Sequence, residues 1–127
     1  AGESMKPRDG RRRSYLRGIV AEYWCAGWLL LKGYRIIKMR YRNRQGEIDI
    51  IAARGNTLVF TEVKARPDRE AALHSVTPAK QRIIARAASG FMAAHEKYSH
   101  NTGLRFDVMV VTSRLQIYHL ENAWSIQ

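Results

Sequence analysis

Residues 46–66 read GEIDIIAARGNTLVFTEVKAR and hold two apolar runs, IDIIA and LVF, each accompanied by charged side chains. Glu47 and Asp49 fall in the first run, and Glu62 and Lys64 follow the second. Carboxylates weaken a strand by propensity, and a buried carboxylate costs free energy unless a partner compensates its charge. The acids of these two segments therefore need either a position facing solvent or a partner.

Strand geometry groups these four side chains. Side chains alternate between the faces of a strand, so Glu47 shares a face with Asp49, and by the same rule Glu62 shares one with Lys64. Across an antiparallel pair, Asp49 can lie near Glu62. Two adjacent carboxylates raise each other's pKa unless a cation lies between them, and Mg²⁺ accepts a few carboxylate oxygens together with water and phosphate. Lys64 would then position or deprotonate an attacking water, or offset phosphate charge. A simple ion pair facing solvent is the alternative that the motif alone leaves open.

The rest of the chain predicts the element order αβββαββ. A Gly-Asn pair predicts a tight turn between the two strands, and a Thr-Pro pair predicts the start of the second helix. A helical crossover normally makes the strands on either side of it parallel. We expect helices over 15–32 and 79–97, a loop over 66–77, and strands over 34–42, 47–54, 57–65, 104–112 and 116–121. The fold class is therefore α/β, with a mixed central sheet flanked by helices and a short extra C-terminal strand.

The amino-acid composition indicates which class of partner the protein binds. The 127 residues suffice for one domain, and 22 Lys and Arg against 11 Asp and Glu give a net charge of +11. Such an excess favours a polyanionic partner, with nucleic acid ahead of membrane, although a generally basic proteome would also produce it. The apolar run at 24–31 is too short to span a bilayer, and the single cysteine, Cys25, fits a reduced, cytoplasmic setting.

The N-terminal residues differ in character from the rest. Residues 1–13 are polar and rich in Arg, so we expect a disordered basic arm there, with 1–4 (AGES, before Met5) derived from a vector. Residues 14–127 then form a single domain.

Several basic residues are candidates for phosphate contacts. Such contacts bind nucleic acid without reading its sequence, and a merely solvated face is the alternative for each cluster. The candidates are Arg40, Arg42 and Arg44 on the first strand and its turn, Arg66 beside the third strand, and Lys80 and Arg82 on the second helix.

The pattern D-(x)n-E-x-K across a hairpin, preceded by a helix bearing an acid, resembles the PD-(D/E)xK, or restriction-endonuclease-like, nuclease superfamily. Within it the chain is similar to the YraN-like family, described as Holliday-junction-resolvase-like. Ile48 stands where the superfamily's name has a proline. The matching stretches are GIVAE (18–22), KGYRII (32–37), GEIDIIA (46–52), LVFTEVKAR (58–66), VTPAKQRII (76–84), RFDVMVV (105–111) and ENAW (121–124).

The resemblance implies a role for each matching residue. Asp49 and Glu62 match the two metal-binding acids, Lys64 the signature lysine, and the carbonyl of Val63 a further metal ligand. Glu22 matches the helix acid that completes the metal site in resolvase-like members.

Three further residues take roles from the same resemblance. Glu47 would lie just outside the metal ligands or towards the substrate. Lys80 and Gln81 begin a helix that in related nucleases directs polar side chains towards the site.

We therefore expect a Mg²⁺-dependent endonuclease that hydrolyses phosphodiester bonds in DNA, with branched or recombination intermediates as substrates and Mn²⁺ as an alternative metal. A non-catalytic nucleic-acid-binding module on the same fold is the second hypothesis, and an RNA-processing or ribosome-associated protein ranks below both. Cleaving a junction would need two sites, so a homodimer stays open.

Overall fold

The computed structural model describes residues 6–98 and 102–125, with side chains described from residue 16 onward. A long first helix is followed by three strands, two helices, a 3-10 turn and two further strands. They are α1 (Lys6–Leu31), β1 (Arg35–Arg42), β2 (Glu47–Arg54), β3 (Thr57–Ala65), α2 (Arg69–His74), α3 (Pro78–Ala94), the 3-10 turn η1 (Glu96–Tyr98), β4 (Gly103–Val111) and β5 (Ile117–Trp124).

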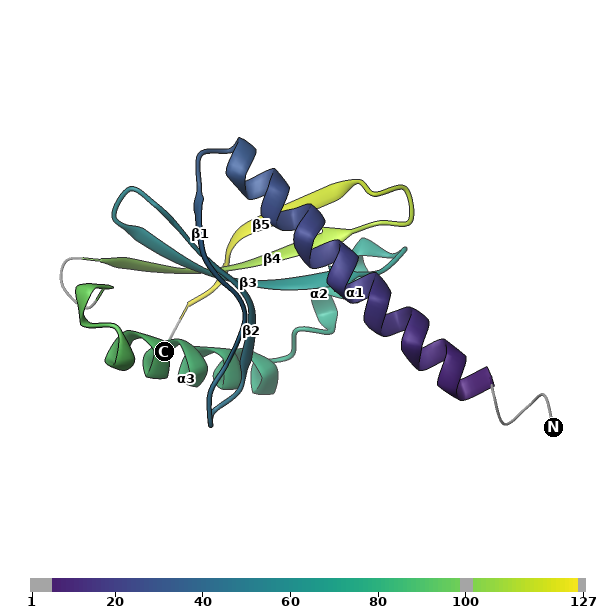
Figure 1. Cartoon of the computed structure of the whole chain (residues 1–127), viewed down its shortest axis with the longest axis horizontal. Coiled ribbons are helices and arrows are strands. Elements are labelled where there is room, and N and C mark those ends of the chain that lie inside the picture. The colour runs from purple at the N-terminus through teal and green to yellow at the C-terminus, as the bar shows by residue number, and fades with distance from the viewer. Residues whose placement is uncertain (1–5, 99–101, 126–127) are drawn as a thin grey trace.

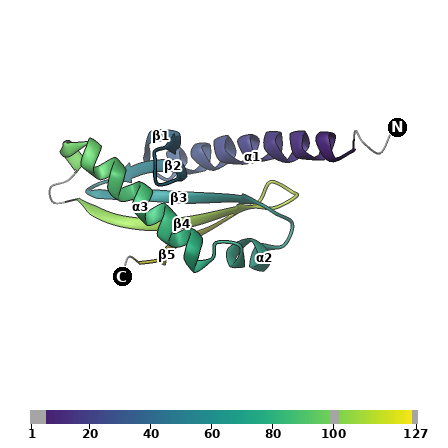
Figure 2. The same ribbon diagram turned by 90° about the horizontal axis from the view of Figure 1, so that it is seen from below.

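The five strands form one sheet in the order β1-β2-β3-β4-β5. The pair β3 and β4 is parallel, and the other three pairs are antiparallel. Helix α1 crosses one face of the sheet, and α2 and α3 lie on the other face (Figures 1 and 2). The expected α/β class, the mixed sheet, the parallel crossover and the additional C-terminal strand are all confirmed.

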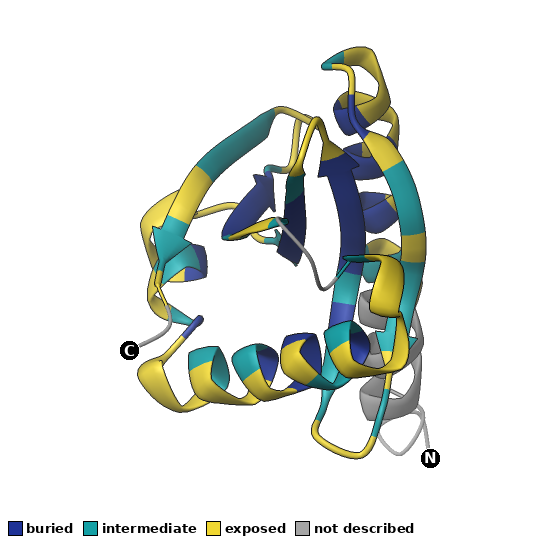
Figure 3. Ribbon diagram, turned by 90° about the vertical axis from the view of Figure 1, so that its left-hand side faces the viewer, coloured by how far each residue is buried: buried dark blue, intermediate teal, exposed yellow. Residues whose placement is uncertain are grey.

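Each face of the sheet buries its own core. Cys25 and Leu29 of α1 pack with Ile50 and Val59, whereas the cluster on the other side contains Phe60 and residues of α3. Figure 3 shows the buried residues gathered on the central strands and on the sides of the helices that face them. Because both faces are covered, the central strands are almost continuously apolar, as expected of strands buried on two sides.

Helix α1 begins at Lys6, nine residues earlier than the sequence predicts. The expectation of a disordered arm is therefore wrong for residues 6–13, and residues 1–5 lie outside the described part. Pro7 falls in the first turn, where its missing N–H costs no intrahelical hydrogen bond, and arginine is a strong helix former. The expectation relied on polarity, which does not oppose helix formation.

The loop expected over 66–77 contains the short helix α2. Its N-cap is Asp68, whose carboxylate accepts hydrogen bonds from the backbone N–H groups of Glu70 and Ala71 at 3.0 and 3.4 Å. A six-residue helix shows too little periodicity for detection by its apolar pattern, so the cap was its main signal. No helix in the described part of the chain is long and apolar enough to cross a membrane.

Candidate active site where β2 and β3 separate

The two strands of the central hairpin separate at the predicted site. Their pairing runs from Arg54 and Thr57 to Ile50 and Thr61 and stops there. Beyond this point β2 continues beside β1 only, and β3 continues beside β4 only. We call the opening between the separated ends the fork.

Asp49 and Glu62 are the first residues on either side of the fork. The carboxylate of Asp49 replaces the lost strand partner, because its Oδ2 accepts a hydrogen bond from the backbone N–H of Val63 at 2.8 Å. The same hydrogen bond fixes the position of the Asp49 side chain beside β3. The sequence predicts that Asp49 and Glu62 lie near each other across paired strands. In the structure they are neighbours, but the strands are no longer paired there, and the side chain of Asp49 makes the contact with β3.

The backbone changes direction at this point. Arg40, which lies between the pairs Met39–Ile50 and Tyr41–Ile48, has a φ of 52°, an uncommon value for a residue other than glycine. Ile50 packs in the core under α1, yet Ile48, two residues away, packs in the core under α3. Regular alternation thus fails at Asp49, which turns its carboxylate into the fork.

Glu62 is nearly buried, with 6% of its surface exposed. Burial raises its pKa to about 9, and the hydrogen bond and charge of Asp49 add to this shift, whereas Lys80 and Lys64 oppose it. The Nζ atom of Lys80 lies 3.6 Å from Glu62 Oε2. In the absence of a cation, Glu62 therefore favours its protonated form.

Glu22 reaches the same region from α1. It is 8% exposed, and its pKa is raised to about 7 by burial and then by the charge of Asp49. Arg40 lowers this pKa through a contact of 3.5 Å between its Nε and Glu22 Oε1, an oxygen that forms no hydrogen bond among the described residues. Burial, and then the charges of Asp49 and Glu22, raise the pKa of Cys25 to about 12, and this fully buried thiol is poorly suited to act as a nucleophile.

Two lysines, Lys64 and Lys80, also lie at the fork. Burial lowers the pKa of Lys64, and the neighbouring charge of Lys80 contributes to the same effect. Lys80 is held at the first turn of α3, where Thr77 Oγ1 accepts a hydrogen bond from its backbone N–H at 3.2 Å. The helix start that the Thr-Pro pair predicts is thus also an N-cap, and it fixes the position of the Lys80 backbone beside the site.

The other sequence-predicted binding residues are only partly available. Glu47 pairs with Arg42 at 3.1 Å and with Arg40 at 3.9 Å, whereas Arg44 in the turn forms no ion pair among the described residues. Gln81 donates from its Nε2 to the carbonyl of Val76, in the turn between α2 and α3, at 3.0 Å, and it lines a groove that contains none of the acids of the fork.

Arg66 directly follows β3, whereas Arg82 lies on α3. Arg66 is exposed and donates to the neighbouring carbonyl of Ala65 at 2.9 Å. Arg82 is also exposed, but it lines a groove on another side of α3, described below.

A second charged cluster surrounds Asp107 on β4, on the α1 face of the sheet. Asp107 is fully buried and accepts hydrogen bonds from Arg105, from His119 Nε2 at 2.7 Å and from the backbone N–H of Asn122 at 2.9 Å. Burial alone would raise its pKa, but these three donors together lower it. The sequence signal was a charged pair in an otherwise apolar strand, although its partner on β5 could not be inferred from that signal.

The donor set of the fork determines which metal it suits. Among the described residues, no three His, Cys, Asp or Glu side chains converge closely enough to hold one ion. Asp49 and Glu62 do converge, and Mg²⁺ commonly binds through one or two carboxylates while keeping several waters. The fork therefore fits a hydrated Mg²⁺ better than a metal that needs a complete protein cage.

Comparison with other proteins identifies relatives over nearly the whole chain. Residues 21–111 match the model of the family described as "Uncharacterised protein family UPF0102". A UPF0102 protein of Rhizobium meliloti is 44% identical over 122 residues, covering 96% of this chain and 99% of the relative. UPF0102 proteins of Bradyrhizobium diazoefficiens and Methylocella silvestris are 45% and 43% identical, covering 82% and 94% of this chain and 77% and 95% of the relatives. The matched family region contains the whole fork.

Proposed function

The chain belongs to the UPF0102 family, and from its fork we propose that it is a metal-dependent endonuclease of the PD-(D/E)xK superfamily that hydrolyses phosphodiester bonds in DNA. The observation that carries this proposal is the convergence of Asp49, Glu62, Lys64 and Lys80 at one opening of the sheet. A polyanion would be repelled by paired acids alone, so their presence in a chain of net charge +11 favours a site completed by a cation.

The acids would hold the metal. Asp49 and Glu62 would supply carboxylate oxygens and Val63 its carbonyl, with Mg²⁺ or Mn²⁺ as the ion. When bound, such an ion polarises a phosphate oxygen and lowers the pKa of water for attack on phosphorus. The hydrogen bond from the Val63 N–H holds Asp49 in place before any ion arrives, which reduces the ordering needed on binding.

The lysines would act on the substrate. Lys64, whose lowered pKa allows loss of a proton nearer neutrality, would orient the attacking water or stabilise charge that develops on the phosphate. Lys80 would hold Glu62 and bind a phosphate oxygen from the N-terminal turn of α3, where the helix dipole also favours negative charge. Glu22 would accept a hydrogen bond from water through Oε1, an oxygen that lies 3.5 Å from Arg40 Nε but accepts no hydrogen bond among the described residues.

A binding module without turnover is the second candidate. It would keep the basic surface and the fold, but it leaves the pairing of Asp49 with Glu62 without a purpose. A pure binder should therefore tolerate the loss of either acid, and a nuclease should not.

The decisive experiment titrates Mg²⁺ and Mn²⁺ into the wild type and into Asp49→Asn, with labelled four-way junction, flap, blunt duplex and single-stranded DNA, and a matching RNA as competitor. We expect metal-dependent cleavage to fall by at least about 100-fold in the variant, because a charged metal ligand is lost. Glu70→Gln, which changes an exposed acid on α2, is the matched control and should cleave normally.

A second readout needs no activity. A metal that binds the folded state alone raises the melting temperature, so Mg²⁺ should stabilise the wild type and not Asp49→Asn. Equal cleavage and equal stabilisation by metal in both proteins would contradict the assignment of the site. DNA binding without cleavage of any substrate would favour the binding module.

A further inference from the structure

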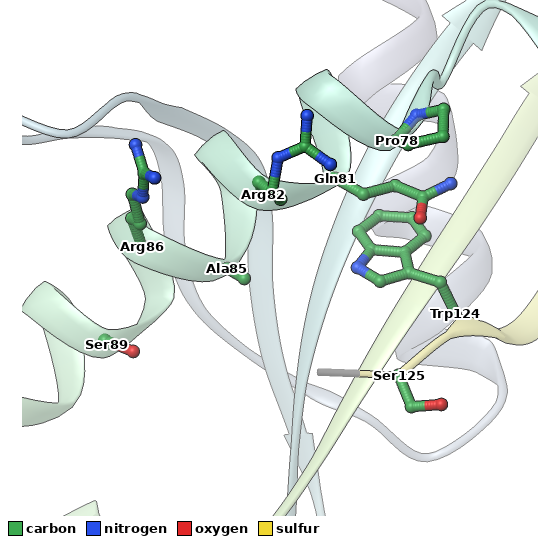
Figure 4. A pocket seen from close by; sticks show the side chains of 8 residues that line it. All are labelled: Pro78, Gln81, Arg82, Ala85, Arg86, Ser89, Trp124 and Ser125. Carbon is green, nitrogen blue, oxygen red and sulfur yellow. The ribbon is translucent and has the colours of Figure 1, made fainter. Parts of the chain in front are cut away.

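A groove of about 700 Å³ runs along α3 on the side that faces the end of β5. Figure 4 shows the indole of Trp124 beside Gln81 and the side chains of Arg82 and Arg86 projecting from α3. The groove is lined by Pro78, Gln81, Arg82, Ala85, Arg86, Ser89, Trp124 and Ser125. None of the acids of the fork lines it, so it is a separate feature of the surface.

Its positive charges are available to a ligand. Arg82 and Arg86 are exposed and form no ion pair with any acid in the described part of the chain, unlike Arg42, which pairs with Glu47. They lie four residues apart on one helix, which separates them by about 6 Å along the helix axis. Two cations repeated along a groove in this way suit a linear polyanion better than a single small anion.

Trp124 supplies a rigid aromatic surface in the same groove. Its ring stacks on Phe106, with centroids 5.2 Å apart and planes 20° apart, which fixes the orientation of the indole. Its Nε1 is buried and has no hydrogen-bond partner in the described residues. The remaining polar side chains of the lining are Gln81 and the hydroxyls of Ser89 and Ser125, which can donate or accept.

Aromatic rings beside free cations are the usual elements of a site for single-stranded nucleic acid. Every base has a face that can stack on an aromatic ring, and arginines follow the backbone regardless of sequence. A duplex keeps its bases stacked on one another, so only an unpaired base could use the ring of Trp124.

The first turns of α3 connect this groove to the fork. Lys80 points to Glu62, while Gln81 and Arg82, the next two residues, line the groove. A strand that leaves the fork on this side therefore first meets the end of the groove that holds Gln81, Trp124 and Arg82, and Arg86 lies farther along α3 (Figure 4).

We propose that this groove binds an unpaired strand adjoining the duplex that is cut at the fork, with its backbone on Arg82 and Arg86 and a base against Trp124. The inference rests on the proposed nuclease function, and it narrows the substrate to DNA that carries a junction between paired and unpaired strands. Such a subsite would select flaps, overhangs or branch points over continuous duplex.

The test measures equilibrium binding of full-length protein in EDTA, where cleavage cannot contribute. The probes are a labelled blunt duplex and the same duplex with a single-stranded overhang of either polarity. We expect the wild type to bind one overhang at least about fivefold more tightly than the blunt duplex, the lower end of what stacking one base contributes. The double variant Arg82→Ala/Arg86→Ala should lose this preference.

Two controls separate the groove from general charge and from folding. Arg17→Ala/Arg114→Ala removes the same charge from exposed positions outside the groove and should keep the preference while weakening binding to both probes. Trp124→Leu should lose the preference, and Trp28→Leu, which changes a partly exposed tryptophan on α1, should keep it. If Trp124→Leu does not fold, the arginine pair still tests the proposal.

The outcomes distinguish this proposal from the nuclease function. A wild type without preference, or an Arg82→Ala/Arg86→Ala variant that retains it, overturns the groove even if Asp49-dependent cleavage is found. A preference that depends on Arg82, Arg86 and Trp124 supports the groove even if no substrate is cleaved, and Asp49→Asn should retain it in either case.

Discussion

The side chain of Glu62 combines burial with a neighbouring negative charge, which raises its pKa from 4.5 to about 9. Between these two values the folded protein holds a proton that the unfolded chain has released. The free energy of unfolding therefore falls as pH rises through this window, because the folded state binds one proton more than the unfolded state and a lower proton concentration disfavours it. Glutamine at this position would remove the titration while retaining the shape.

We predict that Glu62→Gln raises the melting temperature of the metal-free protein at pH 8 and leaves it nearly unchanged at pH 5. The gain at pH 8 should be about 4 °C or more, which corresponds to roughly 1 kcal/mol in a domain of this size. Differential scanning calorimetry in EDTA across this pH range measures it. Glu70→Gln should give the wild-type profile, and parallel profiles for Glu62→Gln and wild type would contradict the prediction.

Asp107 shows the opposite behaviour, because its hydrogen-bond donors favour the ionised form. Its contribution to stability is present above the unfolded pKa near 3.8 and is lost as pH falls towards the lowered folded value. We predict that Asp107→Ala destabilises the fold by about 3–5 kcal/mol, since it leaves the partly buried Arg105 and His119 without their anion. Urea unfolding at pH 7 measures this.

The rim of the same cluster provides the comparison. Glu121, whose side chain is 44% exposed, lies 3.6 Å from Arg105 and 3.9 Å from Lys32. Glu121→Gln should cost less than about 1 kcal/mol, as exposed ion pairs usually do. Equal losses for the Asp107 and Glu121 variants would mean that burial does not determine the strength of this cluster.

At the scale of elements, two glycines in helices have contrasting surroundings. A Cβ at Gly27 of α1 would meet no atom within 4 Å, whereas a Cβ at Gly90 of α3 would lie 2.7 Å from Asn43 Nδ2. Asn43 holds the β1–β2 turn against α3, because its Nδ2 donates to the carbonyl of Ala87 at 3.0 Å. Space at Gly90 is therefore part of the contact between hairpin and helix.

We predict that Gly27→Ala stabilises the protein by about 0.5–1 kcal/mol through helix propensity. Gly90→Ala should instead destabilise it by about 1–3 kcal/mol, since the methyl group displaces Asn43. Denaturant midpoints of the wild type and of the two variants, measured under the same conditions, test both predictions. A gain in stability at Gly90 equal to that at Gly27 would show that the turn moves away from α3 without cost.

Elements that depend on local pattern were predictable from the sequence. The Gly-Asn turn, the alternating strands and the Thr-Pro helix start each depend on neighbouring residues, and the crossover rule added the parallel pairing of β3 with β4. The fork was not predictable in detail, because strand alternation assumes continuous pairing. The hydrogen bond from Val63 to Asp49 replaces that pairing with a side chain, which no periodicity reveals.

Contacts between distant segments explain the remaining differences. The sequence identified Gln81 as a helix residue but could not show that the carbonyl of Val76 would take its amide. It likewise could not show that Glu47 would neutralise Arg42, or that Trp124 would stack on Phe106 beside a groove. Which charged side chains remain available for a ligand is decided by packing, and so it required the structure.

For the molecule as a whole, the net charge of +11 should promote DNA binding mainly through those cations that have no acid beside them. Arg42 and Arg44 stand two residues apart at the same hairpin and are both exposed, but Arg42 lies 3.1 Å from Glu47, and Arg44 has no ion pair in the described residues. A phosphate that contacts Arg42 must compete with this carboxylate. Binding through Arg44 releases counterions from DNA without that competition.

We therefore predict that duplex binding in EDTA weakens steeply as salt increases and that Arg44→Ala reduces the slope of log K against log salt concentration by about 1. Arg42→Ala should change the slope much less, although it removes the same charge. Fluorescence anisotropy titrations at several salt concentrations measure both. Adding Glu47→Gln should free Arg42, so the double variant Arg42→Ala/Glu47→Gln should then have a lower slope than Glu47→Gln alone. Equal slopes for Arg42→Ala and Arg44→Ala would mean that net charge, and not its pairing within the fold, determines how the protein binds DNA.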